Sequence, residues 1–117
     1  MRLAIVGSRD FPFPEMILVY LKTLDPGINT IVSGGASGVD TIAINEARRL
    51  GFKTEVIPAQ WTTSAGIVDK LAGFKRNIVI VQNVDHVEAF WDMMSRGTAH
   101  TIALAFVLGK SLKVNTP

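Results

Sequence analysis

The stretch Ser33–Asp40 (SGGASGVD) lies between the β-branched run Thr30–Val32 and a segment with helical periodicity. Its three glycines let the backbone adopt positive φ and let another molecule approach the main chain closely. The helix that follows presents unpaired N–H groups and the positive end of its dipole, which suits a phosphate or another anion. A tight strand-to-helix turn without a ligand is the alternative. We favour the ligand loop, because a plain turn seldom needs three glycines within five residues.

Segments typical of strands and helices alternate along the rest of the chain. Short apolar runs predict five strands, at Leu3–Val6, Ile28–Val32, Lys53–Ile57, Val87–Trp91 and Ser111–Val114. Helical spacing of apolar residues predicts helices between Pro14 and Asp25, over Asp40–Leu50 and over Ala99–Leu108.

The run Ile78–Val81 is ambiguous, because its residues favour a strand while its position in the alternation favours a crossover helix. We expect a helix there. The alternation then predicts an α/β fold, a Rossmann-like three-layer sandwich with a mostly parallel five-stranded sheet and helices on both faces. Residues 1–117 are expected to form a single domain.

The loops differ according to the end of the strand that they join. Those leading into strands are plain turns, such as Asp25-Pro26-Gly27. Those leaving strands hold the unusual residues: Gly7–Asp10, Ser33–Asp40, Gln60-Trp61 and Ser95–Thr98. Because the carboxyl ends of parallel strands share one edge, the sequence predicts a ligand site at that edge. The long irregular piece from Ala59 to about Leu71 also suggests a functional loop.

The composition narrows the function classes. The chain of 117 residues has a formal net charge of +2, no cysteine, 48% hydrophobic residues and no run of like charges. These values indicate a folded domain without thiol chemistry, and they make a nucleic-acid partner unlikely and a membrane partner unexpected. The first residues form no signal peptide, so we expect a cytoplasmic protein. Met93-Met94 and Phe106–Leu108 suggest a possible homodimer, although core packing explains them equally well.

Several short pieces together resemble the SLOG superfamily, in particular its small stand-alone domains related to YspA. The pieces come in the family's order and cover essentially the whole chain: Gly7–Phe11, Ser33–Asp40, Ala59–Trp61, Ala72-Gly73 with Arg76-Asn77, and Ala89–Asp92 running to Ser95–Thr98. The resemblance implies a Rossmann-like domain that binds a nucleotide or a nucleotide-derived ligand, as a sensor or a processing domain. Relatives include the Lonely Guy phosphoribohydrolases and DNA-processing protein A, which binds single-stranded DNA. On this basis Gly7, Ser8 and Asn77 join the candidate ligand-binding residues.

The chain departs from the Lonely Guy pattern where that family has its catalytic glutamate. Thr101 stands at this position, and a threonine cannot stabilise an oxocarbenium-like transition state as a carboxylate does. Gln60 also stands where members of the SLOG superfamily often have an acidic residue. The arginine that the enzymes use would be Arg76, the one candidate catalytic residue. Cleavage of an N-glycosidic bond is therefore an alternative to ligand binding, and single-stranded DNA binding is a further one.

The glycine-rich stretch supplies the first candidate phosphate-binding site. Gly34, Gly35 and Gly38 are expected to shape an anion-binding nest, and the hydroxyl groups of Ser33 and Ser37 to add hydrogen bonds.

The start of the last helix supplies the second candidate phosphate-binding site. Gly97 and Thr98 would offer main-chain N–H groups and a hydroxyl group to a phosphate, unless Ser95 or Thr98 acts as an ordinary N-cap. Arg9 and Arg76 could each grip a phosphate with two hydrogen bonds, or lie solvated at the surface.

The remaining candidates concern the sugar and the base. Asp40 would either accept a hydrogen bond from a ribose hydroxyl or order the glycine-rich loop, and Trp61 would stack on a base. Trp91 is expected in the core, and His100 is expected to be a surface or packing residue. No cluster of side chains has metal-ligand spacing, so we expect no metal, and no cofactor is required besides a nucleotide ligand.

Overall fold

The central strand of the sheet is the apolar segment β1 (Arg2–Gly7), whose residues Leu3–Val6 are all buried. The computed structural model describes residues 1–117. It has five strands in the order β3-β2-β1-β4-β5, and every neighbouring pair is parallel. The other strands are β2 (Thr30–Ser33), β3 (Lys53–Val56), β4 (His86–Phe90) and β5 (Ser111–Asn115). The four helices are α1 (Glu15–Lys22), α2 (Val39–Arg49), α3 (Ala72–Gln82) and α4 (Arg96–Val107).

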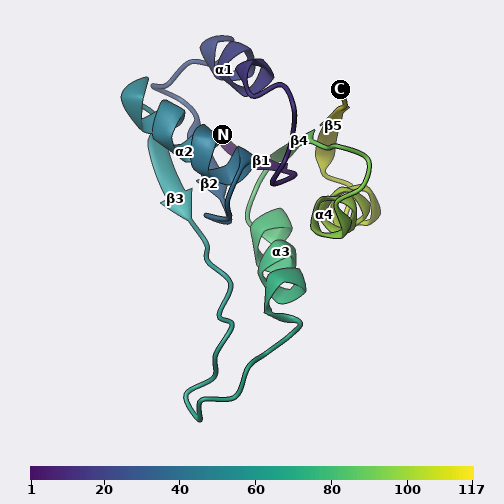
Figure 1. The fold of residues 1–117 in the computed structure, drawn as a ribbon. Coiled ribbons are helices and arrows are strands. Elements are labelled where there is room, and N and C mark those ends of the chain that lie inside the picture. The colour runs from purple at the N-terminus through teal and green to yellow at the C-terminus, as the bar shows by residue number, and fades with distance from the viewer.

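Helices α1 and α2 lie on one face of this sheet and α3 and α4 on the other (Figure 1), and each face carries a hydrophobic cluster. Side chains along a strand point alternately to opposite faces, so Leu3 and Ile5 pack with α1 and α2, while Ala4 and Val6 pack with α3 and α4. Burial on both faces explains why the central strands read as continuous apolar runs. The structure thus confirms the three-layer α/β fold, with a sheet that is wholly rather than mostly parallel.

The ambiguous run Ile78–Val81 lies in α3, as its position in the chain predicted. Ile80 and Val81 are buried against the sheet, whereas Ile78 and Val79 are about two fifths exposed. Two adjacent buried residues after two exposed ones fit one face of a helix and not the strict alternation of a strand. The position of this run between two parallel strands therefore determines its conformation, and the β-propensity of its residues does not. Helix α4 begins at Arg96, three residues before the predicted start at Ala99, so Gly97 and Thr98 lie within its first turn.

The long loop between β3 and α3 forms an arm, residues 57–71, that extends away from the body of the molecule (Figure 1). An antiparallel bridge between Thr62 and Val68 holds its two sides together, and the Asp69 amide donates to the Trp61 carbonyl oxygen over 2.7 Å. The ion pair between Asp69 and Lys75, at 2.7 Å, fastens the base of the arm to α3. The arm can therefore present its side chains beside α3.

Two apolar segments suggested above as dimer or core residues lie on the surface. Met93 and Met94 are 64% and 84% exposed, and Phe106, Val107 and Leu108 at the end of α4 are 79%, 77% and 44% exposed. Core packing therefore does not account for them, and the homodimer remains a prediction. No helix of the chain has the length and apolar character needed to cross a membrane.

Candidate functional site

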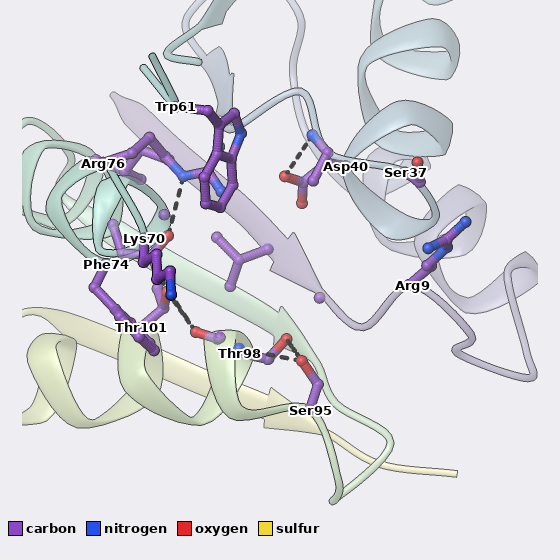
Figure 2. A pocket seen from close by; sticks show the side chains of 17 residues that line it. Arg9, Ser37, Asp40, Trp61, Lys70, Phe74, Arg76, Ser95, Thr98 and Thr101 are labelled. Carbon is purple, nitrogen blue, oxygen red and sulfur yellow. Dashed lines mark hydrogen bonds between the residues drawn. The ribbon is translucent and has the colours of Figure 1, made fainter. Parts of the chain in front are cut away.

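A cavity of about 400 Å³ lies at the carboxyl edge of the sheet, where the loops after β1, β2 and β4 meet α3 and the base of the arm (Figure 2). Its lining combines cationic, hydroxyl, aromatic and main-chain groups from segments far apart in the sequence. Seventeen residues line it: Val6, Gly7, Arg9, Ala36, Ser37, Asp40, Trp61, Lys70, Gly73, Phe74, Arg76, Asn77, Ile80, Ser95, Gly97, Thr98 and Thr101. A larger hollow of about 620 Å³ lies along the arm and α3, and it shares only Arg76 with the cavity.

Three cationic side chains line the cavity, and two of them have no partner in the chain. None of the ion pairs of the structure involves Arg9 or Lys70, and both residues are exposed. Arg76 is engaged instead. Its Nη1 donates to the Gly34 carbonyl oxygen over 2.7 Å, and its Nε donates to Asn77 Oδ1 over 3.1 Å. Arg76 therefore fixes the glycine-rich loop to α3, while Arg9 and Lys70 are free to meet an anion.

The single carboxyl group in the cavity lining belongs to Asp40, in the first turn of α2. Asp40 is only 6% exposed, and its Oδ2 accepts a hydrogen bond from the Ala36 amide over 3.2 Å. Burial raises the pKa of Asp40 to about 6, against the opposing effects of the Ala36 amide, the positive charge of Arg76, the Gly34 amide and the Ser33 hydroxyl group. The site therefore holds a carboxyl group that changes charge close to neutral pH.

The start of α4 forms the opposite wall of the cavity. Ser95 is the N-cap residue, and its Oγ accepts a hydrogen bond from the Thr98 amide over 3.4 Å. Hydrogen bonds from the Ser95 and Met94 amides order the preceding turn and hold the pKa of Asp92 below its usual range. The expected capping by Ser95 is thus present. This capping engages only the Thr98 amide, and the other N–H groups of the first turn have no hydrogen-bond partner within the helix.

Gly97 differs from the other glycines of the chain. A Cβ atom built on it would meet no atom within 4 Å, and its φ is not positive. Neither close packing nor backbone conformation therefore requires a glycine here, although glycine weakens a helix relative to alanine. Its missing side chain leaves the main chain at the start of α4 open to the cavity.

Two aromatic rings line the α3 side of the cavity. Trp61, on the arm, is 54% exposed and lies over α3, where a Cβ atom on Gly73 would come within 3.2 Å of its ring. Phe74 packs edge-to-face against His100 with ring centroids 4.7 Å apart. The Asn77 side chain links the two helices, because its Nδ2 lies 3.3 Å from both the Gly97 carbonyl oxygen and His100 Nδ1. His100 thus packs between α3 and α4, as expected.

Ten of the predicted site residues line the cavity together. They are Gly7, Arg9, Ser37, Asp40, Trp61, Arg76, Asn77, Ser95, Gly97 and Thr98. The expectation that the strand-exit loops converge at one edge of the sheet is thus met by the geometry. Whether these residues bind a ligand remains a prediction.

Five predicted residues do not line the cavity: Ser8, Ser33, Gly34, Gly35 and Gly38. The two serine side chains are fully buried and bonded within the chain. Ser8 Oγ accepts from the Asp92 amide over 3.0 Å, and Ser33 Oγ accepts from the Gly35 amide over 3.3 Å. Close packing explains two of the glycines. A Cβ atom on Gly34 would lie 2.4 Å from Arg76 Nη1, and one on Gly38 would lie 2.3 Å from the Arg9 carbonyl oxygen.

Lys70, Phe74 and Thr101 also line the cavity, although Lys70 and Phe74 were not among the expected site residues and Thr101 was noted only at the position of the Lonely Guy glutamate. Helical spacing could have found two of them, because Phe74 lies within one turn of Arg76-Asn77 and Thr101 lies one turn after Gly97. Lys70 carried no such signal, since the course of the arm decides where it points.

Trp91, expected in the core, belongs to neither hydrophobic cluster. Its Nε1 donates to the Ser95 carbonyl oxygen over 3.0 Å, so it supports the start of α4.

Comparison with known proteins shows which class the fold belongs to. No family model matches the chain, and no curated protein matches its sequence. Among solved structures, DNA processing protein A from Helicobacter pylori, studied for its single-stranded DNA binding mode, matches with a TM-score of 0.79 and 24% identity over 97% of this chain. DNA processing protein A from Streptococcus pneumoniae matches with a TM-score of 0.82 and 22% identity over 97% of this chain. The chain spans 64% and 49% of the length of these two proteins.

The molybdenum cofactor binding protein from Rippkaea orientalis also matches, with a TM-score of 0.71 and 20% identity over 99% of this chain and 76% of that one. The chain therefore has the Rossmann-like fold that these proteins share. These likenesses show the fold alone, and membership of the SLOG superfamily remains a prediction from the sequence motifs. The expectation that nucleic acid is an unlikely partner remains a prediction.

Proposed function

We propose that the chain is a single nucleotide-binding domain whose cavity at the carboxyl edge of the sheet holds a nucleotide or a nucleotide-derived ligand, as a sensor or a processing domain. The observation that carries the proposal is the meeting, in one cavity, of two unpartnered cations, an open helix start and an exposed aromatic ring. A volume of about 400 Å³ lies within the range of small-molecule sites.

The phosphate is expected at the first turn of α4. The N–H groups of a helix start and the positive end of its dipole favour an anion, and the missing side chain of Gly97 lets that anion come close to the main chain. Lys70 and Arg9 add positive charge from the wall of the cavity. Neither cation has to give up an ion pair within the protein to bind a phosphate.

The base is expected beside Trp61. This ring is about half exposed, and bases stack readily on indole rings. Phe74 lines the same side of the cavity and extends the apolar surface. A nucleotide that spans from α4 to Trp61 would use both the anionic and the aromatic parts of the lining.

Calorimetric titration tests the proposal with 5′-AMP, adenosine and ribose 5-phosphate as probes. AMP should bind more tightly than either fragment, since only AMP carries both the phosphate and the base. Lys70→Ala should weaken AMP binding by roughly tenfold, the effect of losing one charged hydrogen bond. The control is Lys53→Ala, which removes the same charge at the start of β3, at the opposite edge of the sheet. Equal affinity for AMP and adenosine would contradict the presence of a phosphate-binding site in the cavity.

Hydrolysis of an N-glycosidic bond has less support than binding. Thr101 lines the cavity at the position of the Lonely Guy glutamate, and its hydroxyl donates to the Gly97 carbonyl oxygen over 3.2 Å. Arg76, the candidate catalytic residue, already donates to Gly34 and Asn77. Chromatography for free adenine after incubation with AMP separates an enzyme from a binding domain.

Single-stranded DNA is the second candidate ligand, because the fold is similar to that of a protein that binds it. Arg9, Lys70 and Trp61 supply the cationic and stacking groups that single strands use. Affinity for oligo(dT) that falls steeply with salt would support this reading.

A further inference from the structure

The Asp40 carboxyl group has one oxygen engaged and one free. Oδ2 accepts the hydrogen bond from the Ala36 amide over 3.2 Å, and Oδ1 accepts none of the hydrogen bonds of the structure, although the nearby Gly34 amide and Ser33 hydroxyl group also help to lower the pKa of the carboxyl group. No side-chain oxygen or nitrogen of the protein is both shut off from solvent and without a hydrogen-bond partner. The free oxygen of a side chain that is only 6% exposed must therefore reach the surface that Asp40 lines, which is the cavity.

No positive charge of the protein neutralises this carboxyl group at contact distance. Arg76 acts on it through space, but its Nη1 and Nε donate to the Gly34 carbonyl oxygen and to Asn77. Asp40 forms no ion pair with Arg76, Arg9 or Lys70. A buried carboxylate without an ion pair is costly, so the cavity favours a ligand that donates a hydrogen bond to it.

The position of Asp40 shows which part of a nucleotide could donate. Figure 2 places the Asp40 carboxyl group beside Trp61 and across the cavity from Ser95 and Thr98. In a nucleotide the sugar lies between the base and the phosphate. With the base at Trp61 and the phosphate at the start of α4, the group that faces Asp40 is the ribose, whose hydroxyl groups are hydrogen-bond donors.

We propose that the free carboxylate oxygen of Asp40 accepts a hydrogen bond from a ribose hydroxyl, so that the cavity selects ribonucleotides over their deoxy analogues. The inference rests on the proposed nucleotide-binding function and names the ligand class within it. A deoxy analogue would place a carbon atom against the buried carboxylate and leave that oxygen without a donor. The same selection works against a DNA strand in this cavity.

The test compares 5′-AMP, 2′-deoxy-AMP and 3′-deoxy-AMP by calorimetry on the unchanged protein. At least one deoxy analogue should bind roughly tenfold more weakly than AMP, because removing the donor leaves a charged acceptor unpaired. This comparison needs no variant, so it does not depend on whether a substitution disturbs the fold.

Asp40→Asn then assigns the selection to this residue. The amide oxygen of the new side chain can still accept from the Ala36 amide, while a neutral NH₂ group replaces the charged oxygen. The preference for AMP should shrink to within about threefold, since the NH₂ group cannot accept the hydrogen bond that the carboxylate oxygen accepts from a ribose hydroxyl. The matched control is Asp10→Asn, which removes the same charge from an exposed residue that does not line the cavity and should keep the full preference.

The outcomes separate the inference from the function on which it rests. Tight and equal binding of all three nucleotides would overturn the role of Asp40 and leave nucleotide binding standing. An unchanged preference in Asp40→Asn would assign the selection to another residue and overturn the inference as well. Failure of all three to bind would overturn the proposed function itself, and the inference with it.

Discussion

Arg76 Nη1 donates a hydrogen bond to the Gly34 carbonyl oxygen over 2.7 Å and so joins α3 to the loop that follows β2. The two residues are 42 positions apart in the sequence, and a Cβ atom on Gly34 would lie 2.4 Å from the same nitrogen. The absence of a side chain at Gly34 is therefore what lets the guanidinium group approach the main chain. This contact sets the shape of the cavity wall.

We predict that Gly34→Ala and Arg76→Ala are coupled. Each substitution removes the same contact, so each should lower the free energy of unfolding by about 1–3 kcal/mol, the range for losing a buried network. The double variant should lose clearly less than the sum of the two. Urea denaturation of the four proteins measures this coupling, and strictly additive losses would show that the two residues act independently.

Gly97→Ala should separate stability from binding. The added Cβ meets no atom of the protein, and alanine is the better helix former, so the free energy of unfolding should rise by up to about 1 kcal/mol. Affinity for AMP should nevertheless fall, because the methyl group enters the space in which the phosphate approaches the main chain.

Gly51→Ala is the control for Gly97→Ala. This glycine also has open space around it, but its φ of +89° strains any side chain, so the variant should lose stability and keep its AMP affinity. Unchanged AMP affinity in Gly97→Ala would contradict a phosphate-binding site at the start of α4.

Asp40 should make stability depend on pH in a predictable direction. Its pKa is about 6 in the folded protein against an ordinary value of 3.8, so between these pH values the folded state binds more protons than the unfolded state. Stability from this group is therefore greatest below about pH 4, falls as the pH rises toward 6, and is constant above that. The full cost is on the order of 3 kcal/mol.

Asp40→Asn removes this dependence. Its stability relative to the unchanged protein should rise between pH 4 and pH 7, as measured by urea denaturation at a series of pH values. Asp10→Asn, at an exposed position, should show no such trend. A stability difference for Asp40→Asn that stays the same across the range would mean that burial does not disfavour the charged form.

Trp61→Ala should weaken AMP binding by roughly tenfold to a hundredfold, as stacking on an aromatic ring contributes about 1–3 kcal/mol per base. Binding of ribose 5-phosphate, which has no base, should not change. Trp61→Phe keeps a ring at this position and should recover most of the affinity. Equal losses for AMP and ribose 5-phosphate would show that Trp61 holds the arm in place and does not contact the base.

The sequence predicts well what local patterns determine. The apolar runs place all five strands, and the alternation of elements identifies α3 despite the β-branched residues of Ile78–Val81. Because the strands are parallel, the unusual loops had to meet at one edge, and Gly7, Ser37 and Gly97 do line one cavity there.

What the sequence does not predict depends on contacts between distant segments. Gly34 and Gly38 look like ligand-binding glycines, but the space that they leave is taken by Arg76 and by the main chain of Arg9. Lys70 enters the cavity because the arm turns back toward α3, and no periodicity in residues 57–71 marks that course. The sequence thus shows where the glycines stand, but it does not show which neighbouring group occupies the space that each glycine leaves.

A crystal structure of the protein grown with 5′-AMP tests the central claim most directly. We predict density for the phosphate at the first turn of α4 beside Gly97, with the adenine ring against Trp61 and the ribose facing Asp40. AMP bound on another face of the molecule, or a cavity without nucleotide density at saturating AMP, would contradict the account.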